Sequence, residues 1–282
     1  MKLHIQHTLR YQYDRPVFFD PLTLRLRPQT QAFVNVLDYQ RQIDPIPAGL
    51  CGQHDAFDNH AELAWFDGEH DHLHIALEAT VETTLINPFG FFITDPAATQ
   101  LPLNELPTLA MVPAVYRRTV EVGSAVAAFA QQVADQADGR TQGFLSSLAD
   151  RIHRDFQTVH REAGPTWPAE QTLERGAGAC RDFAVLFIAA CRSQGIPARF
   201  VSGYGWASDE SVENELHAWA EVFLPGPGWH GYDPTLGLAV ADAHVPVARA
   251  PEPAAAAPTQ GTYRGSDIAS RMQYQVQVTA AP

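Results

Sequence analysis

The chain has 282 residues, a formal net charge of −13, and 45% hydrophobic against 18% charged residues. This balance is typical of a globular protein, and the length suggests about two domains. The acidic excess argues against a nucleic-acid partner, because contacts with phosphates depend on clustered Lys and Arg, and no basic run exceeds Arg117-Arg118.

The N-terminal sequence and the number of cysteines indicate in which cellular compartment the protein is expected. The first residues, MKLHIQHTLRYQYD, alternate polar and apolar positions and lack the apolar core of a signal peptide. No uninterrupted apolar run reaches the roughly 18 residues that a membrane span requires. The three cysteines are too few for a disulfide framework. We therefore expect a cytoplasmic protein with no membrane partner.

Residues 1–86 show the pattern of β-structure. Apolar and polar residues alternate from Lys2 to Tyr13, and Leu22, Leu24 and Leu26 continue the same period of two. The dipeptide at 67–68, Asp-Gly, separates AELAWF from a long alternating run, which predicts a β-hairpin. Several strands without a helical period predict an N-terminal antiparallel β-sandwich.

After residue 86 the sequence pattern changes, first to a proline-rich segment and then to helical spacing. Residues 87–113 contain five prolines, which indicates a connection laid over the surface. Residues 114–282 are assigned to a second domain that begins with helices. Apolar spacing predicts one helix around 126–133 and another over 145–159, and a short third helix is predicted between Pro168 and Gly176.

A helix that is apolar on every face, DFAVLFIAAC, follows at residues 182–191 and is expected to be buried all round. Strands are predicted after it, over 197–206, 217–224 and 229–235. A Pro/Ala-rich stretch near 250–258 indicates a loop, and alternation from Met272 to Val278 predicts a final strand. The predicted fold class is therefore α+β.

The first candidate site residue is Cys180, in the sequence RGAGACRDFAVLF. It stands where the buried helix begins, so its thiol faces the unpaired N–H groups and the positive end of that helix. Such a position favours the reactive thiolate, and the N–H of Cys180 could hold an oxyanion. The alternative is an inert, buried cysteine. Cys191 has apolar neighbours and is predicted to be a core residue, and Cys51 is expected to have no role.

A thiolate nucleophile needs an imidazole, and the imidazole needs an acceptor that orients it. If LPGPG (224–228) forms a turn, Phe223 opposes Trp229 across a hairpin. His217 and Asp233 then become diagonal neighbours on one face, within side-chain reach. A slip of one residue would separate them, so the prediction depends on this register.

These segments resemble the transglutaminase-like cysteine hydrolase superfamily, in its bacterial branch with a preceding β domain. The matching sequences are GACRDFA (178–184), RSQGIPARFVSGY (192–204), HAWAEV (217–222), GW (228–229) and YDPT (232–235). The resemblance implies a papain/transglutaminase-like core, with a nucleophile helix packed on an antiparallel sheet. It places the nucleophile, base and orienting acid at Cys180, His217 and Asp233.

Two positions depart from the family's pattern. Relatives tend to read Phe-Gly-Asn where this chain has Phe57-Asp58-Asn59, and we expect the turn to survive because Asp tolerates a positive φ. After Val247, relatives often carry an Arg-Asp-Tyr-like stretch, which this chain replaces with Ala248-Arg249-Ala250.

The activity expected from the resemblance is acyl transfer through a thioester on a peptide or protein substrate. Hydrolysis is favoured, with crosslinking of glutamine to amines as the second reading and a catalytically vestigial binding scaffold as the third. Trp219 is a candidate for the site wall. No calcium-loop pattern is present, so no cofactor is expected.

Three histidines offer a possible metal site. His70, His72 and His74 recur every second residue, a spacing that metal ligands can use. The same face of the predicted strand carries Glu78 and Glu82, which indicates a solvated face, and no metal is expected.

Overall fold

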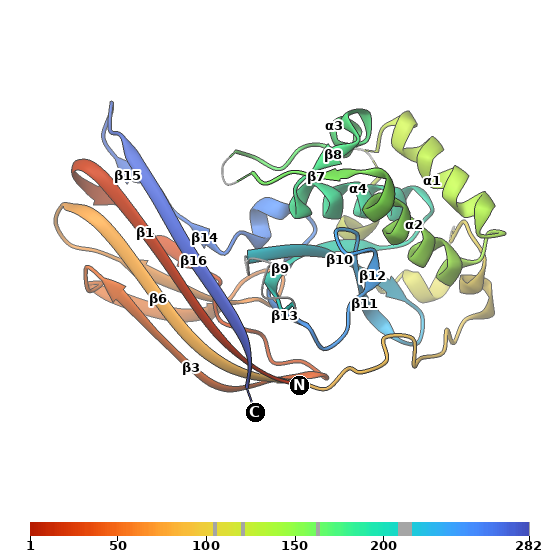
Figure 1. Ribbon diagram of the computed structural model, residues 1–282, viewed down its shortest axis with the longest axis horizontal. Helices are drawn as coiled ribbons and strands as arrows, with labels where there is room; N and C mark the ends of the chain where they lie inside the picture. Colours follow the sequence, from red (N-terminus) through yellow and green to blue (C-terminus); the bar gives the residue numbers. More distant parts are fainter. Residues whose placement is uncertain (104–105, 120–121, 162–163, 208–215, 282) are drawn as a thin grey trace.

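The computed structural model describes residues 1–103, 106–119, 122–161, 164–207 and 216–281. It confirms the α+β class: the long strands β1, β3, β6 and β16 lie on one side of the molecule, and the helices lie on the other, together with a separate sheet (Figure 1). None of the helices described is long and apolar enough to cross a bilayer.

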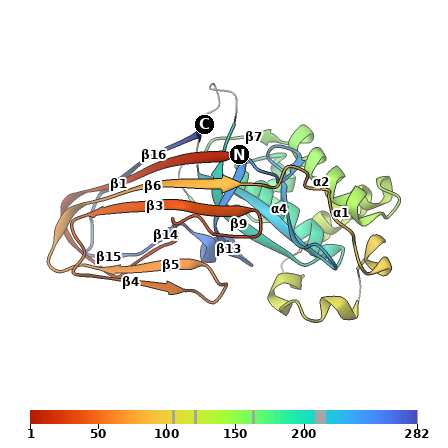
Figure 2. The same cartoon turned by 90° about the horizontal axis from the view of Figure 1, so that it is seen from below.

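The N-terminal part is a sandwich of two antiparallel sheets, seen edge-on as two layers in Figure 2. In the first sheet β1 is central, flanked by β6 and, on its other side, by β16 and β15; β3 pairs with β6. The second sheet has the order β14-β2-β5-β4. The strand bounds are β1 (Lys2–Phe19), β2 (Leu22–Leu24), β3 (Val34–Asp44), β4 (Gly49–His54), β5 (His60–Trp65), β6 (His70–Thr83), β14 (Thr259–Gln260), β15 (Tyr263–Arg264) and β16 (Ser270–Ala281).

The predicted hairpin at Asp67-Gly68 is wrong. The chain does turn there, with φ at +80° for Gly68, but β5 and β6 lie in different sheets and do not pair. Alternate residues of both strands face the same core, among them Ala64 on β5 and Ile75 on β6. A period of two therefore identifies both strands, but cannot distinguish pairing within a sheet from stacking across a sandwich.

The final strand lies in the first sheet, although its residues fall within the predicted second domain, 114–282. β16 runs antiparallel to β1 along twelve residue pairs, from Lys2 opposite Ala281 to Tyr13 opposite Ser270. Its Val276 and Val278 are buried in the sandwich core. The two ends of the chain thus build one sheet.

The second part packs helices on one face of an antiparallel sheet of order β12-β11-β10-β9-β13. The central helix α4 contacts strands β9 and β10 as well as the helices α1, α2 and α3. The bounds are α1 (Ser124–Gln136), α2 (Thr141–Asp155), α3 (Ala169–Arg175), α4 (Cys180–Ser193), β9 (Ala198–Gly205), β10 (Leu216–Leu224), β11 (Gly228–Asp233), β12 (Leu238–Ala239) and β13 (His244–Ala250). Short elements are η1 (Pro96–Thr99), η2 (Pro107–Leu109), η3 (Ala114–Arg117), η4 (Pro253–Ala256) and the parallel pair β7 (Gln157–Thr158) and β8 (Ala177–Gly178).

The expected helices are present, with one change of length. The second was predicted to continue to residue 159, but α2 ends at Asp155 because the chain becomes extended at Phe156 and enters β7. Phe156 still packs against the helical core, which explains why its spacing continued the helical pattern.

Polar contacts and shared core residues join the sandwich to the second part. Tyr204 on β9 is buried in the sandwich core, and its hydroxyl lies 3.0 Å from Nδ1 of His7 on β1. Asn59 donates to the backbone carbonyl of Arg249 at 2.7 Å and accepts from its N–H at 2.7 Å. Asp58, before it, has φ at +62°, so the turn survives the replacement of glycine as expected.

Candidate active site

Cys180 is the first residue of α4, as predicted, and its side chain is partly exposed. The buried carboxylate of Asp182, in the first turn, accepts from the N–H of Ala179 at 2.9 Å and from the N–H of Trp167 at 2.8 Å. These bonds fix the start of the helix against the preceding loop. The thiol therefore lies in a defined place at the positive end of α4.

The glycines before Cys180 have backbone and packing roles. Gly176 ends α3 in the left-handed region, with φ at +57°. A Cβ at Gly178 would lie 3.0 Å from Cβ of Asp182 and 3.1 Å from the ring of Phe183. Gly178 thus allows β8 to pack closely on α4.

His217 and Asp233 meet through the predicted hairpin register. Phe223 opposes Trp229, and the pairing of β10 with β11 continues to Ala220 opposite Tyr232. Nε2 of His217 lies 2.7 Å from Oδ2 of Asp233. Cys180 and His217 line the same cavity, so the structure brings the three predicted site residues together in one region.

The Asp233 carboxylate is fully buried and holds its charge through four contacts. Besides His217, its Oδ2 contacts Nε2 of His244 at 2.9 Å, while Oδ1 accepts from the N–H groups of Thr235 (2.9 Å) and Leu236 (3.2 Å). Burial alone would raise the pKa of Asp233, but these partners hold it well below its ordinary value.

The electrostatics of His217 follow from this carboxylate. Burial lowers the pKa of the imidazole, but the charge of Asp233, the hydrogen bond with Asp233 and the electrostatic interaction with Cys180 outweigh burial and raise that pKa well above its ordinary value. The side chain is 16% exposed and therefore reachable from the cavity. The site stabilises a protonated imidazole beside the thiol.

His244 was not found by sequence reasoning. It is the first residue of β13, its side chain is 2% exposed, and it shares the same carboxylate oxygen with His217. β13 pairs with β9 instead of β10 or β11, so no hairpin register connects it with Asp233. The sequence does show a histidine at the start of a strand that follows Asp233. The order of strands in the sheet was needed to see that this histidine reaches the carboxylate.

Trp219 does not line the site, which corrects its proposed role as a wall. Its side chain is 1% exposed and lies behind the histidines, with ring centroids 6.3 Å from His217 and 5.1 Å from His244. A Cβ at Gly203 would lie 2.6 Å from the Trp219 ring, so glycine at 203 allows this packing.

His217, Asp233 and His244 offer three possible metal-ligand atoms within 4.8 Å of one another. Ligand atoms around a tetrahedral zinc ion lie about 3.3 Å apart. Both imidazole nitrogens instead approach one oxygen, at 2.7 and 2.9 Å, which is hydrogen-bond geometry. The cluster is best described as two imidazoles oriented by one carboxylate.

The other two cysteines and the histidines of β6 lie apart from this cluster. Cys191 is fully buried, and burial raises its pKa. Cys51 is exposed on β4. His72 lies on the polar face of β6, with Nδ1 2.7 Å from Oδ1 of Asp71.

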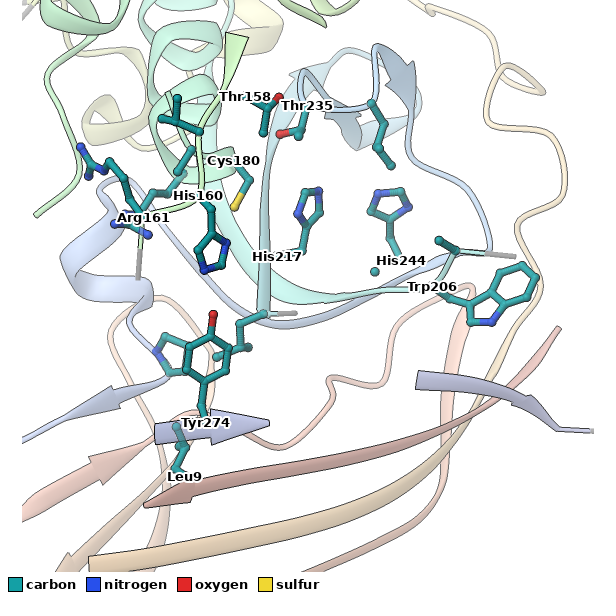
Figure 3. A pocket seen from close by; sticks show the side chains of 18 of the residues that line it. Leu9, Thr158, His160, Arg161, Cys180, Trp206, His217, Thr235, His244 and Tyr274 are labelled. Carbon is teal, nitrogen blue, oxygen red and sulfur yellow. The ribbon is translucent and has the colours of Figure 1, made fainter. Parts of the chain in front are cut away.

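A cavity of about 440 Å³ opens over the thiol and the imidazole (Figure 3). Cys180, His217 and His244 line it from the second part of the chain, together with His160 and Arg161, which follow β7. The sandwich lines the opposite side, where Figure 3 shows Leu9 and Tyr274 across from Cys180. The candidate site is therefore a cleft between the two parts of the molecule.

Comparison with known proteins agrees with this architecture. The chain matches the Transglutaminase-like superfamily over residues 127–234 and the Bacterial transglutaminase-like N-terminal region over residues 3–82. The uncharacterized protein ML0607 of Mycobacterium leprae is 24% identical over 279 residues, which cover 94% of each chain. The Protein-glutamine gamma-glutamyltransferase of Pseudomonas aeruginosa is 29% identical over 114 residues, which are 37% of this chain and 17% of that protein.

A crystal structure from Cytophaga hutchinsonii, described as a "Putative Cysteine Protease", superposes with a TM-score of 0.73. It covers 100% of this chain and 92% of its own, at 19% sequence identity, which demonstrates a shared fold. The two matched regions together span more than half of the sequence. The chain thus belongs to the transglutaminase-like superfamily and joins a transglutaminase-like core to a bacterial transglutaminase-like N-terminal region.

Proposed function

We propose that this protein is a cysteine-dependent enzyme that transfers an acyl group from a peptide or carboxamide, most readily to water. The observation that carries the proposal is that the partly exposed thiol of Cys180 lines one cavity with the imidazole of His217, which the buried carboxylate of Asp233 orients. A nucleophile, a base within reach and an acceptor that orients the base are the parts that nucleophilic catalysis requires.

In the first step the Cys180 thiolate attacks the carbonyl carbon, and the carbonyl oxygen gains the negative charge. The N–H of Cys180, in the first turn of α4, is outside the helix's own hydrogen-bond ladder and is suited to that oxyanion. Protonated His217 then gives its proton to the leaving nitrogen. The C–N bond breaks, an amine or ammonia departs, and a thioester remains on Cys180.

In the second step a water molecule attacks the thioester and gives a proton to His217. The C–S bond breaks, the carboxylic acid leaves, and the thiolate returns beside the imidazolium. Asp233 keeps its charge throughout and fixes the orientation of His217, because its depressed pKa disfavours proton uptake.

Transfer to an amine in place of water is the second candidate. The similarity to the Pseudomonas glutamyltransferase over 114 residues supports it. Lys2 is the single lysine of the chain, so self-crosslinking has hardly any acceptor within it. A labelled amine offered with a glutamine peptide separates the candidates, since incorporation of label indicates transfer and release of glutamate without label indicates hydrolysis.

The nucleophile is tested by alkylation with iodoacetamide at about pH 6, below the ordinary cysteine pKa of about 8.5. We expect rapid single labelling of Cys180 and much slower labelling in His217→Ala, with exposed Cys51 as the internal reference. If Cys180 reacts no faster than Cys51 in either protein, the thiol is not activated and a non-catalytic binding scaffold is the better explanation.

We further propose that the substrate is a peptide or protein and that nucleic acid is not a partner, on the basis of the net charge of −13. The free thiols at all three cysteines support a reducing compartment, and the cytoplasm stays a prediction.

A further inference from the structure

The two ends of the chain contribute a second wall to the cleft. On β1 and β16, Leu9 lies opposite Tyr274 and Tyr11 lies opposite Met272 in the antiparallel register. All four side chains line the cavity that contains Cys180 and His217. These two adjacent pairs, Leu9–Tyr274 and Tyr11–Met272, are called the sandwich wall below.

The sandwich wall continues the buried face of the sheet. Farther along β16, Val276 and Val278 alternate on the same face and are 8% and 3% exposed in the sandwich core. Met272, two residues beyond Tyr274 on that face, is 44% exposed. Its exposure arises where the face passes from the core into the cleft, and an apolar face opening into a cavity is typical of ligand sites.

The charged side chain of Arg161 lines the cavity on the side opposite the sandwich wall. Arg161 follows β7, and its guanidinium lies 3.5 Å from the buried carboxylate of Asp182. Figure 3 shows Arg161 beside Cys180 and His160, above the level of Tyr274 and Leu9. The sandwich wall itself carries no ionisable group except the tyrosine hydroxyls, and that of Tyr11 lies 3.1 Å from the hydroxyl of Thr259. A charged substrate side chain would lose water there without gaining a partner of opposite charge.

We infer that the sandwich wall binds an apolar, preferably aromatic, side chain of the acyl-donor polypeptide, next to the residue whose carbonyl group Cys180 attacks. This inference rests on the proposed acyl-transfer function and assigns a specificity role to the N-terminal region. The cavity of about 440 Å³ lies within the usual size range of ligand pockets and has room for one such side chain beside the reacting group.

The test compares two thiol-reactive probes, acetyl-Phe-Gly chloromethyl ketone and acetyl-Ser-Gly chloromethyl ketone. Both alkylate Cys180, and they differ only in the side chain offered to the sandwich wall. Pockets for an apolar group discriminate by about 10- to 200-fold. We expect the Phe probe to label Cys180 at least about tenfold faster than the Ser probe.

Variants of β16 give matched controls within one strand. Met272→Ser and Tyr274→Ser should each lower the Phe/Ser rate ratio by at least about threefold. Gln273 and Gln275 are exposed on the opposite face of β16, so Gln273→Ser and Gln275→Ser should leave the ratio unchanged. Exposed Met272 makes this variant safe for folding, and it keeps the test valid if Tyr274→Ser is unstable.

A wild-type ratio below about two, or equal losses in Met272→Ser and Gln275→Ser, would overturn the inference. Failure of the proposed function gives a different result: slow labelling of Cys180 by iodoacetamide as well as by both probes. The Phe/Ser ratio remains measurable in that case, because chloromethyl ketones also alkylate unactivated thiols.

Discussion

His244 offers a sharp test of the electrostatics of the site. Its Nε2 lies 2.9 Å from the Asp233 oxygen that also holds His217. Replacement of His244 by Phe removes the donor but keeps an aromatic ring against Trp219. Replacement by Gln keeps an N–H at about the position of Nε2. The two variants separate the hydrogen bond from the packing.

The expected loss of stability follows from burial. His244 is 2% exposed and Asp233 is fully buried, so water cannot replace the missing donor. A hydrogen bond to a charged group contributes about 1.5–3 kcal/mol. We expect His244→Phe to lower the free energy of unfolding by about that amount, and His244→Gln to recover at least half of it.

The same change should be visible at His217. The N–H of His244 directs its positive end at Asp233 and offsets part of the carboxylate charge. Without it, the carboxylate attracts the His217 imidazolium more strongly, and the pKa of His217 should rise further. In His244→Gln the donor is retained, so this pKa should stay close to that of the wild type.

Urea unfolding and NMR titration of the histidine ring protons measure these two effects. The resonance of His217 is assigned by its disappearance in His217→Ala. An unchanged unfolding midpoint together with an unchanged His217 titration in His244→Phe would refute the reasoning. Equal losses in His244→Phe and His244→Gln would mean that shape, and not the donated hydrogen bond, is what the site requires.

Three further predictions follow from charged and buried groups. Asp233→Asn removes the charge that raises the pKa of His217, so its NMR titration should fall toward the ordinary value of about 6.5. Arg249→Met breaks the buried ion pair with Glu221, so it should lower the free energy of unfolding, measured with urea, by about 3–5 kcal/mol. Arg249 and Arg199 together hold the pKa of Glu221 at about 2 against the effect of burial. Burial lowers the pKa of His7 to about 4, so its contribution to stability is fully present above about pH 6.5. As the pH drops toward 4, the free energy of unfolding measured with urea should fall by up to about 3 kcal/mol, and His7→Leu should abolish this loss.

The controls use matched groups elsewhere in the chain. Arg264→Met breaks a solvent-exposed pair with Asp20, so it should leave the free energy of unfolding nearly unchanged. For His217 the sign is opposite to that of His7: a raised pKa stabilises the fold below about pH 6.5, and the contribution is lost as pH rises through the folded pKa. Asp233→Asn should no longer lose stability as the pH rises, and His7→Leu should no longer lose stability as the pH falls toward 4. If either loss of stability persists in its variant, the assignment to that histidine is wrong.

The positions of the three candidate site residues were predictable from the sequence because each follows from local geometry. Cys180 starts a helix that its apolar residues already identify, and the turn at 224–228 sets the register between β10 and β11. That register alone places His217 and Asp233 on one face. The structure then adds the 2.7 Å contact, which spacing could not supply.

Other features depend on how strands are ordered, which local patterns do not encode. His244 reaches Asp233 because β13 lies beside β9, on the far side of β10 from β11. Alternation marked β16 as a strand but did not reveal its partner. Arg249, in the stretch that departs from the family's pattern, contacts Glu221 on β10 at 3.1 Å, a role that depends on the same strand order.

In the proposed enzyme, the residues assigned to catalysis and the residues assigned to selectivity come from different parts of the chain. Cys180, His217 and Asp233 come from neighbouring elements of one core, whereas the sandwich wall comes from the first and last strands. Because Met272 and Tyr274 lie across the cavity and outside the hydrogen bonds of Asp233, substitutions there can change which side chain is bound without moving the carboxylate or its histidines. A β-sandwich joined to the core by buried contacts, such as His7 with Tyr204, holds that wall in place opposite the thiol.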